Sequence, residues 1–130
     1  MSDSTTTWLR AEGFAVFLGA VGAYIALDAS WLLFALLLLA PDLSMLGYLA
    51  GPRTGAGAYN LVHLYLWPAG LLVLGISGAP WALPPAAIWA AHIGLDRALG
   101  FGLKRPGGFR DTHLGRLRGP ADAGSPAEPA

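Results

Sequence analysis

Four long apolar stretches separated by short polar turns dominate the pattern of the chain. The second contains Trp31–Ala40, a run of aliphatic and aromatic residues without the period of two that a strand requires. A transmembrane helix needs about 20 mostly apolar residues, because lipid offers the backbone no hydrogen-bonding partners. The pattern therefore predicts four transmembrane helices, at about residues 8–27, 31–50, 54–77 and 81–100.

The breaks between these stretches carry residues typical of tight turns. They are Asp28-Ala29-Ser30, Gly51-Pro52-Arg53 and Gly78-Ala79-Pro80. Connections this short place successive helices antiparallel, so we expect an all-α membrane protein, a four-helix transmembrane bundle. A cleaved signal peptide is the second interpretation of the first stretch, and the scarcity of basic residues before it argues against that reading.

Lysine and arginine gather in the segments at one side of the predicted bundle. Arg10 opens the first stretch and Arg53 lies between the second and third, while the other two connections carry no basic residue. Basic residues favour the cytoplasmic side, so we expect both termini there, in a multi-pass protein of the bacterial inner membrane. The remaining basic residues that carry this signal follow the fourth stretch: Lys104, Arg105, Arg110, Arg116 and Arg118.

The end of the chain differs in character from the spans. Residues 101–118 mix basic and apolar side chains, which is typical of a segment lying on the inner leaflet against anionic lipid headgroups. The alternative is that these basic residues only mark the cytoplasmic side of the membrane, without the segment lying on the leaflet. We expect residues 1–118 to form a single transmembrane domain and residues 119–130, rich in Pro, Ala and Gly, to be a disordered tail.

Composition narrows the function classes. Hydrophobic residues make up 55% of the 130 residues and charged residues 12%, with zero net charge and no cysteine. This excludes a basic nucleic-acid binder, a disulfide framework and thiolate chemistry. In the first stretch, Ala11, Ala15, Gly19 and Ala23 form a small-residue stripe that lets another helix approach closely, either inside the bundle or in a homo-oligomer.

Ionisable residues inside the spans point to a site. Each costs about 3 kcal/mol in lipid unless it has a partner. At 1.5 Å of rise per residue, Asp42, His63 and His92 lie at a common depth, about 12–14 Å from the cytoplasmic ends of three helices. Asp96 shares a helix face with His92, because the two are four residues apart. The sequence predicts a cytoplasm-facing polar pocket of these four, supported by Glu12, Asn60 and Arg97.

Two imidazoles with one or two carboxylates suit zinc, manganese or iron(II). As an enzyme, the protein would be a metal-dependent hydrolase of a lipid-like or membrane-proximal substrate, with metal-activated water and with Asp96 or His92 as the catalytic proton carrier. Proton relay or solute transport is a second reading. The third is a non-enzymatic scaffold or subunit whose polar residues lock helix packing.

Two prolines and two C-terminal residues are further candidates to shape this pocket. Pro41 and Pro68 are expected to kink their helices and free backbone carbonyls near it. Asp111 and His113 are candidates for the pocket mouth. The alternative is that Asp111 or Thr112 caps a short surface helix.

Five blocks of the sequence carry a family resemblance: residues 41–53, 59–63, 92–97, 100–104 and 111–116. The chain resembles the small bacterial membrane proteins of domain of unknown function family 4260, which implies an integral membrane protein without an assigned activity. Phe101 and Arg105 depart from that pattern, in which tyrosine is common at both positions.

A fainter similarity links the chain to membrane-bound metal-dependent hydrolases, which also place a Pro-Asp pair and histidines in apolar helices. It implies Asp42, His63 and His92 as the corresponding ligands. The acidic residue expected directly after the Pro-Asp pair is missing, because Leu43 and Ser44 follow it.

Overall fold

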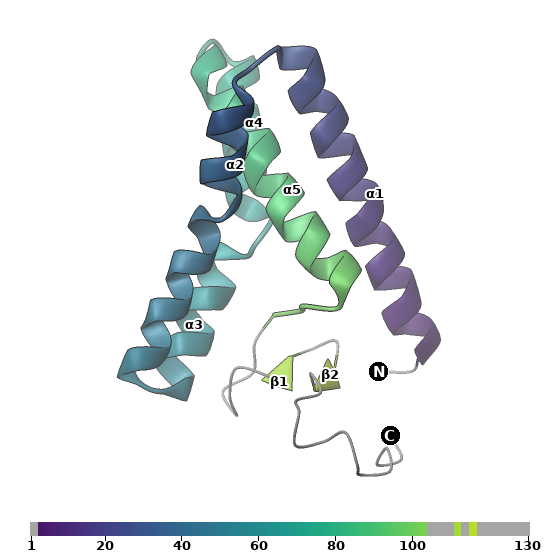
Figure 1. Cartoon of the computed structure of the whole chain (residues 1–130), viewed down its shortest axis with the longest axis vertical. Coiled ribbons are helices and arrows are strands. Elements are labelled where there is room, and N and C mark those ends of the chain that lie inside the picture. The colour runs from purple at the N-terminus through teal and green to yellow at the C-terminus, as the bar shows by residue number, and fades with distance from the viewer. Residues whose placement is uncertain (1–2, 104–110, 113–114, 117–130) are drawn as a thin grey trace.

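The computed structural model describes residues 3–103, 111–112 and 115–116 (Figure 1). The chain is built from helices, with two strands of two residues each. In chain order the elements are α1 (Asp3–Leu27), α2 (Trp31–Leu38), the 3-10 helix η1 (Ala40–Ala50), α3 (Pro52–Val62), α4 (Leu66–Ile76), the 3-10 helix η2 (Pro80–Ala82), α5 (Leu83–Leu99), β1 (Asp111–Thr112) and β2 (Gly115–Arg116).

The predicted helical stretches agree with these elements. Within the residues that the structure describes, three segments are long and apolar enough to cross a membrane: Ser4–Leu27, Trp31–Ala50 and Pro52–Ile76. With η2 and α5, the described chain has the four helical segments that a four-helix arrangement requires. The second and third segments are each divided into two helical pieces, so they are less regular than the sequence pattern indicates.

In each segment the helical piece that follows the division has a proline in its first turn. In the second segment the backbone N–H of Asp42 donates to the Leu39 carbonyl, three residues back, at 3.1 Å. Pro41 has no N–H to continue the α-helical ladder, which explains the tighter turn. In the third, α3 ends at Val62 and Pro68 lies in the first turn of α4, where its missing N–H needs no partner.

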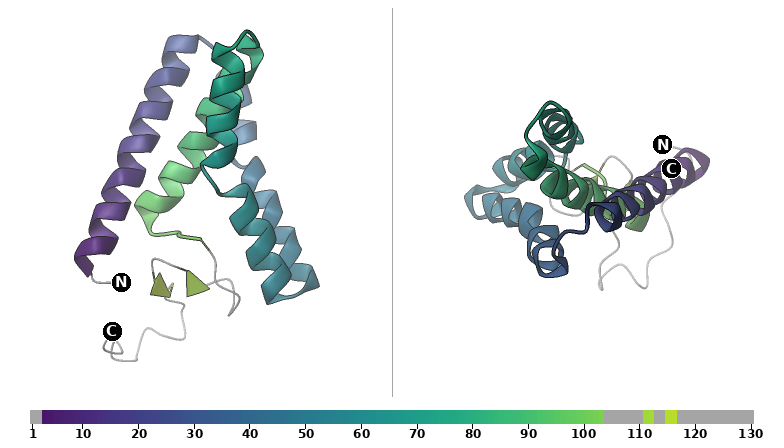
Figure 2. Two further views of the ribbon diagram at one scale, coloured as in Figure 1. Left: turned by 180° about the vertical axis from the view of Figure 1, so that it is seen from behind. Right: turned by 90° about the horizontal axis from the view of Figure 1, so that it is seen from above.

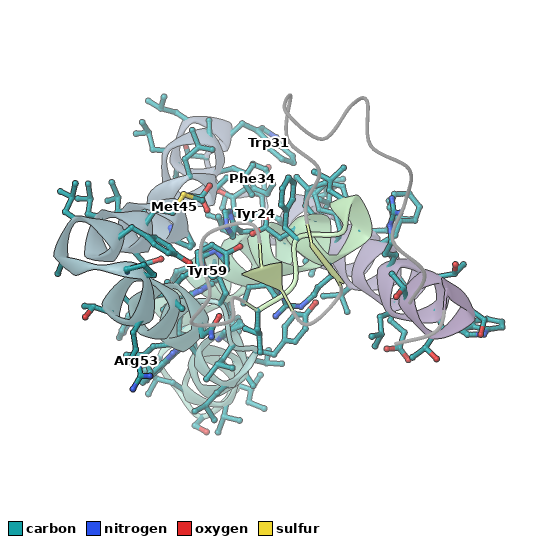
Figure 3. The ribbon with its side chains drawn as sticks, turned by 90° about the horizontal axis from the view of Figure 1, so that it is seen from below. Tyr24, Trp31, Phe34, Met45, Arg53 and Tyr59 are labelled. Carbon is teal, nitrogen blue, oxygen red and sulfur yellow. The ribbon has the colours of Figure 1, made fainter. Side chains whose placement is uncertain are left out.

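Helix α5 lies at the centre of the molecule and positions the rest. It packs against α1 along one side and against α2 and α4 on others, whereas η1 and α3 pack mainly on each other (Figures 1 and 2). The free end of the η1–α3 hairpin, the start of α1 and the end of α5 lie at the same end of the molecule. Near the opposite end, the rings of Tyr24, Trp31 and Phe34 pack together (Figure 3).

The contact between α1 and α5 depends on two glycines. A Cβ atom on Gly94 would lie 2.7 Å from the carbonyl oxygen of Gly13 and from the backbone nitrogen of Phe17. The two backbones therefore touch at this crossing, as small residues permit in membrane helices. The buried residues of α1 follow from it: Gly13, Ala20 and Tyr24 face inward.

This crossing corrects the expectation that the small-residue stripe of the first span packs inside the bundle. Ala11, Ala15, Gly19 and Ala23 are all exposed in the structure. The reason is a rotation of α1 about its axis, because Gly13, not the stripe, gives the closest approach to α5.

A substitution at this crossing should destabilise the fold. Gly94→Ala places a methyl group against the backbone of α1, and overpacking of this kind costs about 1–3 kcal/mol. We expect a lower thermal midpoint in detergent. Gly22→Ala is the matched control, since its Cβ meets nothing within 4 Å and alanine favours the helix. Equal thermal midpoints for the two variants would contradict the close approach.

The described C-terminal residues form a short antiparallel pair, in which Asp111 faces Arg116 and Thr112 faces Gly115. The alternative expectation that Asp111 or Thr112 caps a surface helix is therefore wrong, because both belong to β1. His113 and the predicted tail at 119–130 lie outside the described residues. The inner-leaflet placement of residues 101–118 stays a prediction.

Candidate metal centre

Four polar side chains from three separate segments converge at the centre of the fold. Asp42 lies in the first turn of η1, His63 follows the last residue of α3, and His92 and Asp96 lie one turn apart in α5. One nitrogen or oxygen of each lies within 4.8 Å of the others. The depth match between three helices predicted this meeting of Asp42, His63 and His92.

The distances between the converging atoms are nearly equal. His63 Nε2 lies 3.5 Å from Asp42 Oδ1 and 3.4 Å from Asp96 Oδ2. His92 Nε2 lies 3.2 Å from Asp42 Oδ1 and 3.3 Å from Asp96 Oδ2. The two Nε2 atoms are 3.1 Å apart. Five of the six pairs therefore lie between 3.1 and 3.5 Å, which describes a compact tetrahedral group.

The other nitrogen of each ring contacts a backbone carbonyl. His63 Nδ1 lies 2.7 Å from the Tyr59 oxygen, and His92 Nδ1 bonds to the Leu38 oxygen. A carbonyl oxygen only accepts, so each Nδ1 must carry the proton and donate. In the neutral rings both Nε2 atoms then present a lone pair to the centre. Four electron-pair donors thus face one another.

Irregular backbone supplies one of these carbonyls. In an α-helix, the Leu38 carbonyl would accept from the N–H of Asp42 four residues on. At the start of η1 that N–H donates to Leu39 instead, which leaves the Leu38 oxygen for the His92 ring. The proline-induced break and the histidine contact therefore depend on each other.

The end of α3 is held by side chains from its neighbours. Trp67 Nε1 donates to the Leu61 carbonyl at 2.6 Å, and Trp89 Nε1 donates to the Val62 carbonyl at 2.8 Å. Arg97 donates to the carbonyls of His63 at 3.2 Å and Phe101 at 3.0 Å. A helix end inside a membrane must have its carbonyls satisfied, and these donors fix the break that carries His63.

Burial differs among the four side chains. His63 is fully buried and His92 is 5% exposed, whereas Asp96 is 16% and Asp42 35% exposed. The expected open pocket is therefore a closely packed cluster, and Asp42 is its most accessible member. Two carboxylates this close repel each other in a medium of low dielectric constant, so positive charge beside them stabilises the group.

Tyr59 contributes more to the cluster than its sequence position suggested. Its hydroxyl donates to Asp96 Oδ2 at 3.2 Å, and its ring stacks on the His63 imidazole with 3.7 Å between centroids. Figure 3 shows Tyr59 between the η1–α3 hairpin and α5. The spacing of four residues between Tyr59 and His63 was the available signal. The kink expected at Pro41 indicated a freed carbonyl near the site, but not that it would be the Leu38 carbonyl or that His92 would bond to it.

The other predicted site residues lie around the cluster. Asn60 is partly buried on α3, and Glu12 is exposed on α1. Arg97 donates to the carbonyls of His63 and Phe101, which places it beside the cluster. Of the two candidates for the pocket mouth, Asp111 is described only as part of β1, and His113 lies outside the described residues.

Comparison with known proteins finds one family that matches most of the chain. The family described as Domain of unknown function (DUF4260) matches residues 6–117, which include all four residues of the cluster and nearly all of the described chain. No curated protein and no solved structure matches. The chain therefore belongs to the family of domain of unknown function 4260.

Proposed function

We propose that this protein binds one divalent transition-metal ion, preferentially zinc, between Asp42, His63, His92 and Asp96. The observation that carries the proposal is the set of five distances between 3.1 and 3.5 Å. Zinc bonds to nitrogen and oxygen are about 2.0–2.1 Å long, so the ligand atoms of a tetrahedral site are about 3.3–3.4 Å apart. The cluster has the size of such a site.

Charge and hydrogen bonding support the same ion. The two carboxylates carry a formal charge of −2, which a divalent cation balances inside the membrane. The Tyr59 and Leu38 carbonyls hold the two rings with Nε2 inward, as outer partners of metal-ligating histidines do. Manganese favours six mainly oxygen ligands, whereas two imidazoles and two carboxylates in a tetrahedron favour zinc.

A scaffold held by protons explains the geometry less well. If both Nε2 atoms carried protons, two donors would face each other at 3.1 Å. If one carried a proton, the cluster would keep a net negative charge and several of the short distances would lack an attractive partner. A central cation accounts for all five distances at once. Metal analysis of the purified protein and its ligand variants tests the proposal.

Metal-dependent hydrolysis is the second candidate function, and the exposure of Asp42 favours it. A catalytic zinc site keeps a position for water or substrate, and the 35% exposed Asp42 is the ligand that solvent reaches most easily. His92 and Asp96 direct their inner atoms into the cluster, which favours ligation, and their predicted catalytic role stays a proposal. Hydrolysis of a lipid-like ester by zinc-loaded protein, absent in His63→Gln, would support this function.

We also infer that the cluster lies in the cytoplasmic half of the bacterial inner membrane. Arg10 and Arg53 belong to elements that end at the same end of the molecule, which supports the positive-inside orientation. With this orientation Asp42, the most exposed of the four, lies in the cytoplasmic half of the bilayer.

Removing the Tyr59 hydroxyl should weaken the site without abolishing it. Tyr59→Phe keeps the ring stacked on His63 but deletes the hydrogen bond to Asp96. Outer partners of metal ligands contribute about 10–100-fold to affinity. We expect about tenfold weaker zinc binding in a competition titration against a chromophoric chelator. Tyr48→Phe removes a hydroxyl outside the four-residue cluster and should bind as the wild type does; equal affinities of all three proteins would contradict the role of Tyr59.

A further inference from the structure

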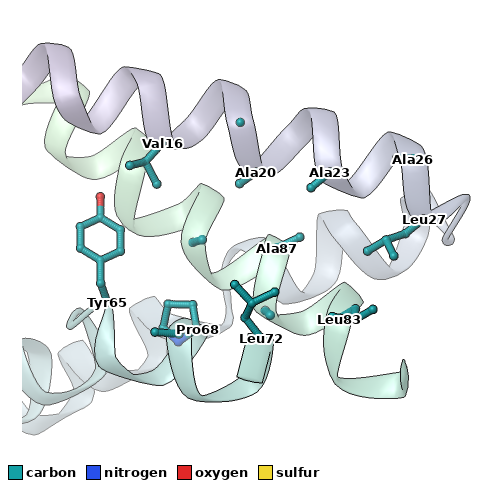
Figure 4. Close-up of a pocket in the computed structure, with 14 residues that line it drawn as sticks. Val16, Ala20, Ala23, Ala26, Leu27, Tyr65, Pro68, Leu72, Leu83 and Ala87 are labelled. Carbon is teal, nitrogen blue, oxygen red and sulfur yellow. The ribbon is translucent and has the colours of Figure 1, made fainter. Parts of the chain in front are cut away.

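An apolar groove of about 530 Å³ runs between α1, α4 and α5 (Figure 4), and none of its lining residues belongs to the four-residue cluster. Gly19 and Ala23 line it from α1, Leu72 from α4 and Leu83 from α5. At one end stands Tyr65, whose hydroxyl points toward α1. In a membrane-spanning molecule, a groove with this lining is chemically matched to an acyl chain.

A second cavity of about 430 Å³ adjoins the groove; its wall is mainly apolar but holds two charged side chains, and we call it the polar cavity. Val16 and Tyr65 line both cavities, and the second also has Glu12 and Arg97 in its walls. Within the described chain, Glu12 and Arg97 form no ion pair with each other. A carboxylate and a guanidinium that border one cavity without pairing match a ligand that carries both a phosphate and an ammonium group.

We propose that the two cavities together bind one zwitterionic phospholipid of the phosphatidylethanolamine class. Its phosphate contacts Arg97, its ammonium contacts Glu12, and one acyl chain lies in the groove. Along α1 the groove extends from Val16 to Leu27, a path of about 16 Å, which matches the half-thickness of about 15 Å that one leaflet offers. The groove therefore holds one extended chain. A lipid with a purely anionic head is disfavoured by Glu12.

The exposed small residues of α1 fit this role. Ala15 lines the polar cavity, and Gly19 and Ala23 line the groove. Side chains this small leave room for an alkyl chain against the helix backbone. A second copy of this chain is the other candidate occupant of the stripe, and the experiment distinguishes the two.

Binding of the lipid does not require the metal ion. The bound lipid would be a substrate only if the proposed metal centre exists, so that part of the inference rests on the proposed function. Arg97 connects the two, since it borders the polar cavity and also donates to the carbonyl of His63. The head of the lipid would therefore lie beside the segment that carries a metal ligand. Lipid retention by metal-stripped protein separates failure of the metal proposal from failure of this one.

Native mass spectrometry in detergent, with phosphatidylethanolamine or phosphatidylglycerol added to delipidated protein, tests the proposal. Gly19→Leu fills the groove, whereas Gly22→Leu makes the same change on the exposed surface of α1 outside it; neither Cβ position meets an atom within 4 Å. We expect phosphatidylethanolamine affinity to fall at least about tenfold in Gly19→Leu and to stay within about twofold of wild type in Gly22→Leu.

The head contacts are tested separately. Glu12→Gln should reduce the preference for phosphatidylethanolamine over phosphatidylglycerol from about tenfold to none. Ala23→Leu is the second groove-filling variant and replaces Gly19→Leu if that protein does not fold. Equal lipid affinity of groove-filling and control variants would overturn the proposal. So would a wild-type dimer that the groove-filling variants convert to monomer, because the stripe would then be a subunit interface.

Discussion

His92→Gln is expected to abolish stoichiometric metal binding. Wild-type protein purified in detergent without chelators should carry about one zinc ion per chain, and the variant less than about a tenth of that, because one of four ligands is lost. Glutamine is chosen because it fills a similar volume and can still hydrogen bond. Inductively coupled plasma mass spectrometry of protein and matched buffer gives the metal content. His63→Gln and Asp96→Asn should behave in the same way.

Glu12→Gln is the control for this series. It removes a carboxylate from a membrane-spanning helix, but Glu12 lies outside the group of converging ligand atoms. Its zinc content should equal that of the wild type. If the wild-type protein takes up no zinc even when zinc is supplied during purification, the metal centre is refuted and the polar cluster serves helix packing alone.

Removing the metal is expected to lower the thermal midpoint of the wild-type protein by on the order of 10 °C. A ligand held at about 1,000 times its Kd stabilises the folded state by about 4 kcal/mol, and a free energy of this size corresponds to such a shift in a chain of this length. The metal would join η1, the end of α3 and α5, three segments with irregular backbone between them. Differential scanning fluorimetry with and without chelator, followed by zinc restoration, measures the effect.

The double variant His63→Leu/His92→Leu distinguishes metal binding from packing. Leucine fills much of the volume of each imidazole, and apolar replacement of a buried polar group is often neutral for stability. We expect this protein to fold and its thermal midpoint to be insensitive to chelator and to zinc. An equal chelator effect in the double variant and in the wild type would show that the stabilising ion binds elsewhere.

The sequence was a good guide where local rules decide the structure. The four helical stretches follow from the length of each apolar run, and the turns follow from residues such as Gly51 and Gly78. The common depth of Asp42, His63 and His92 follows from the constant rise of a helix, and the structure brings the three together. The family resemblance, carried by blocks that include these residues, is confirmed over residues 6–117.

Features that depend on how the helices rotate and cross could not be predicted in this way. The small-residue stripe indicated the wrong face of α1, because Gly13 and Gly94 set the crossing with α5. The Leu38 carbonyl became a partner of His92 only after the backbone changed to a 3-10 turn before Asp42. Neither contact leaves a periodic signal in the sequence.

By itself, then, the sequence determined that the protein is helical, apolar enough to enter a membrane, and equipped with acids and imidazoles at matching heights. Tertiary structure alone decided that the four side chains meet as a closely packed cluster, that both rings turn Nε2 inward, and that Asp42 is the most exposed of the four. The physical reason is that helix formation and insertion depend on each segment alone, whereas side-chain direction depends on crossings and breaks set by packing between segments distant in the chain.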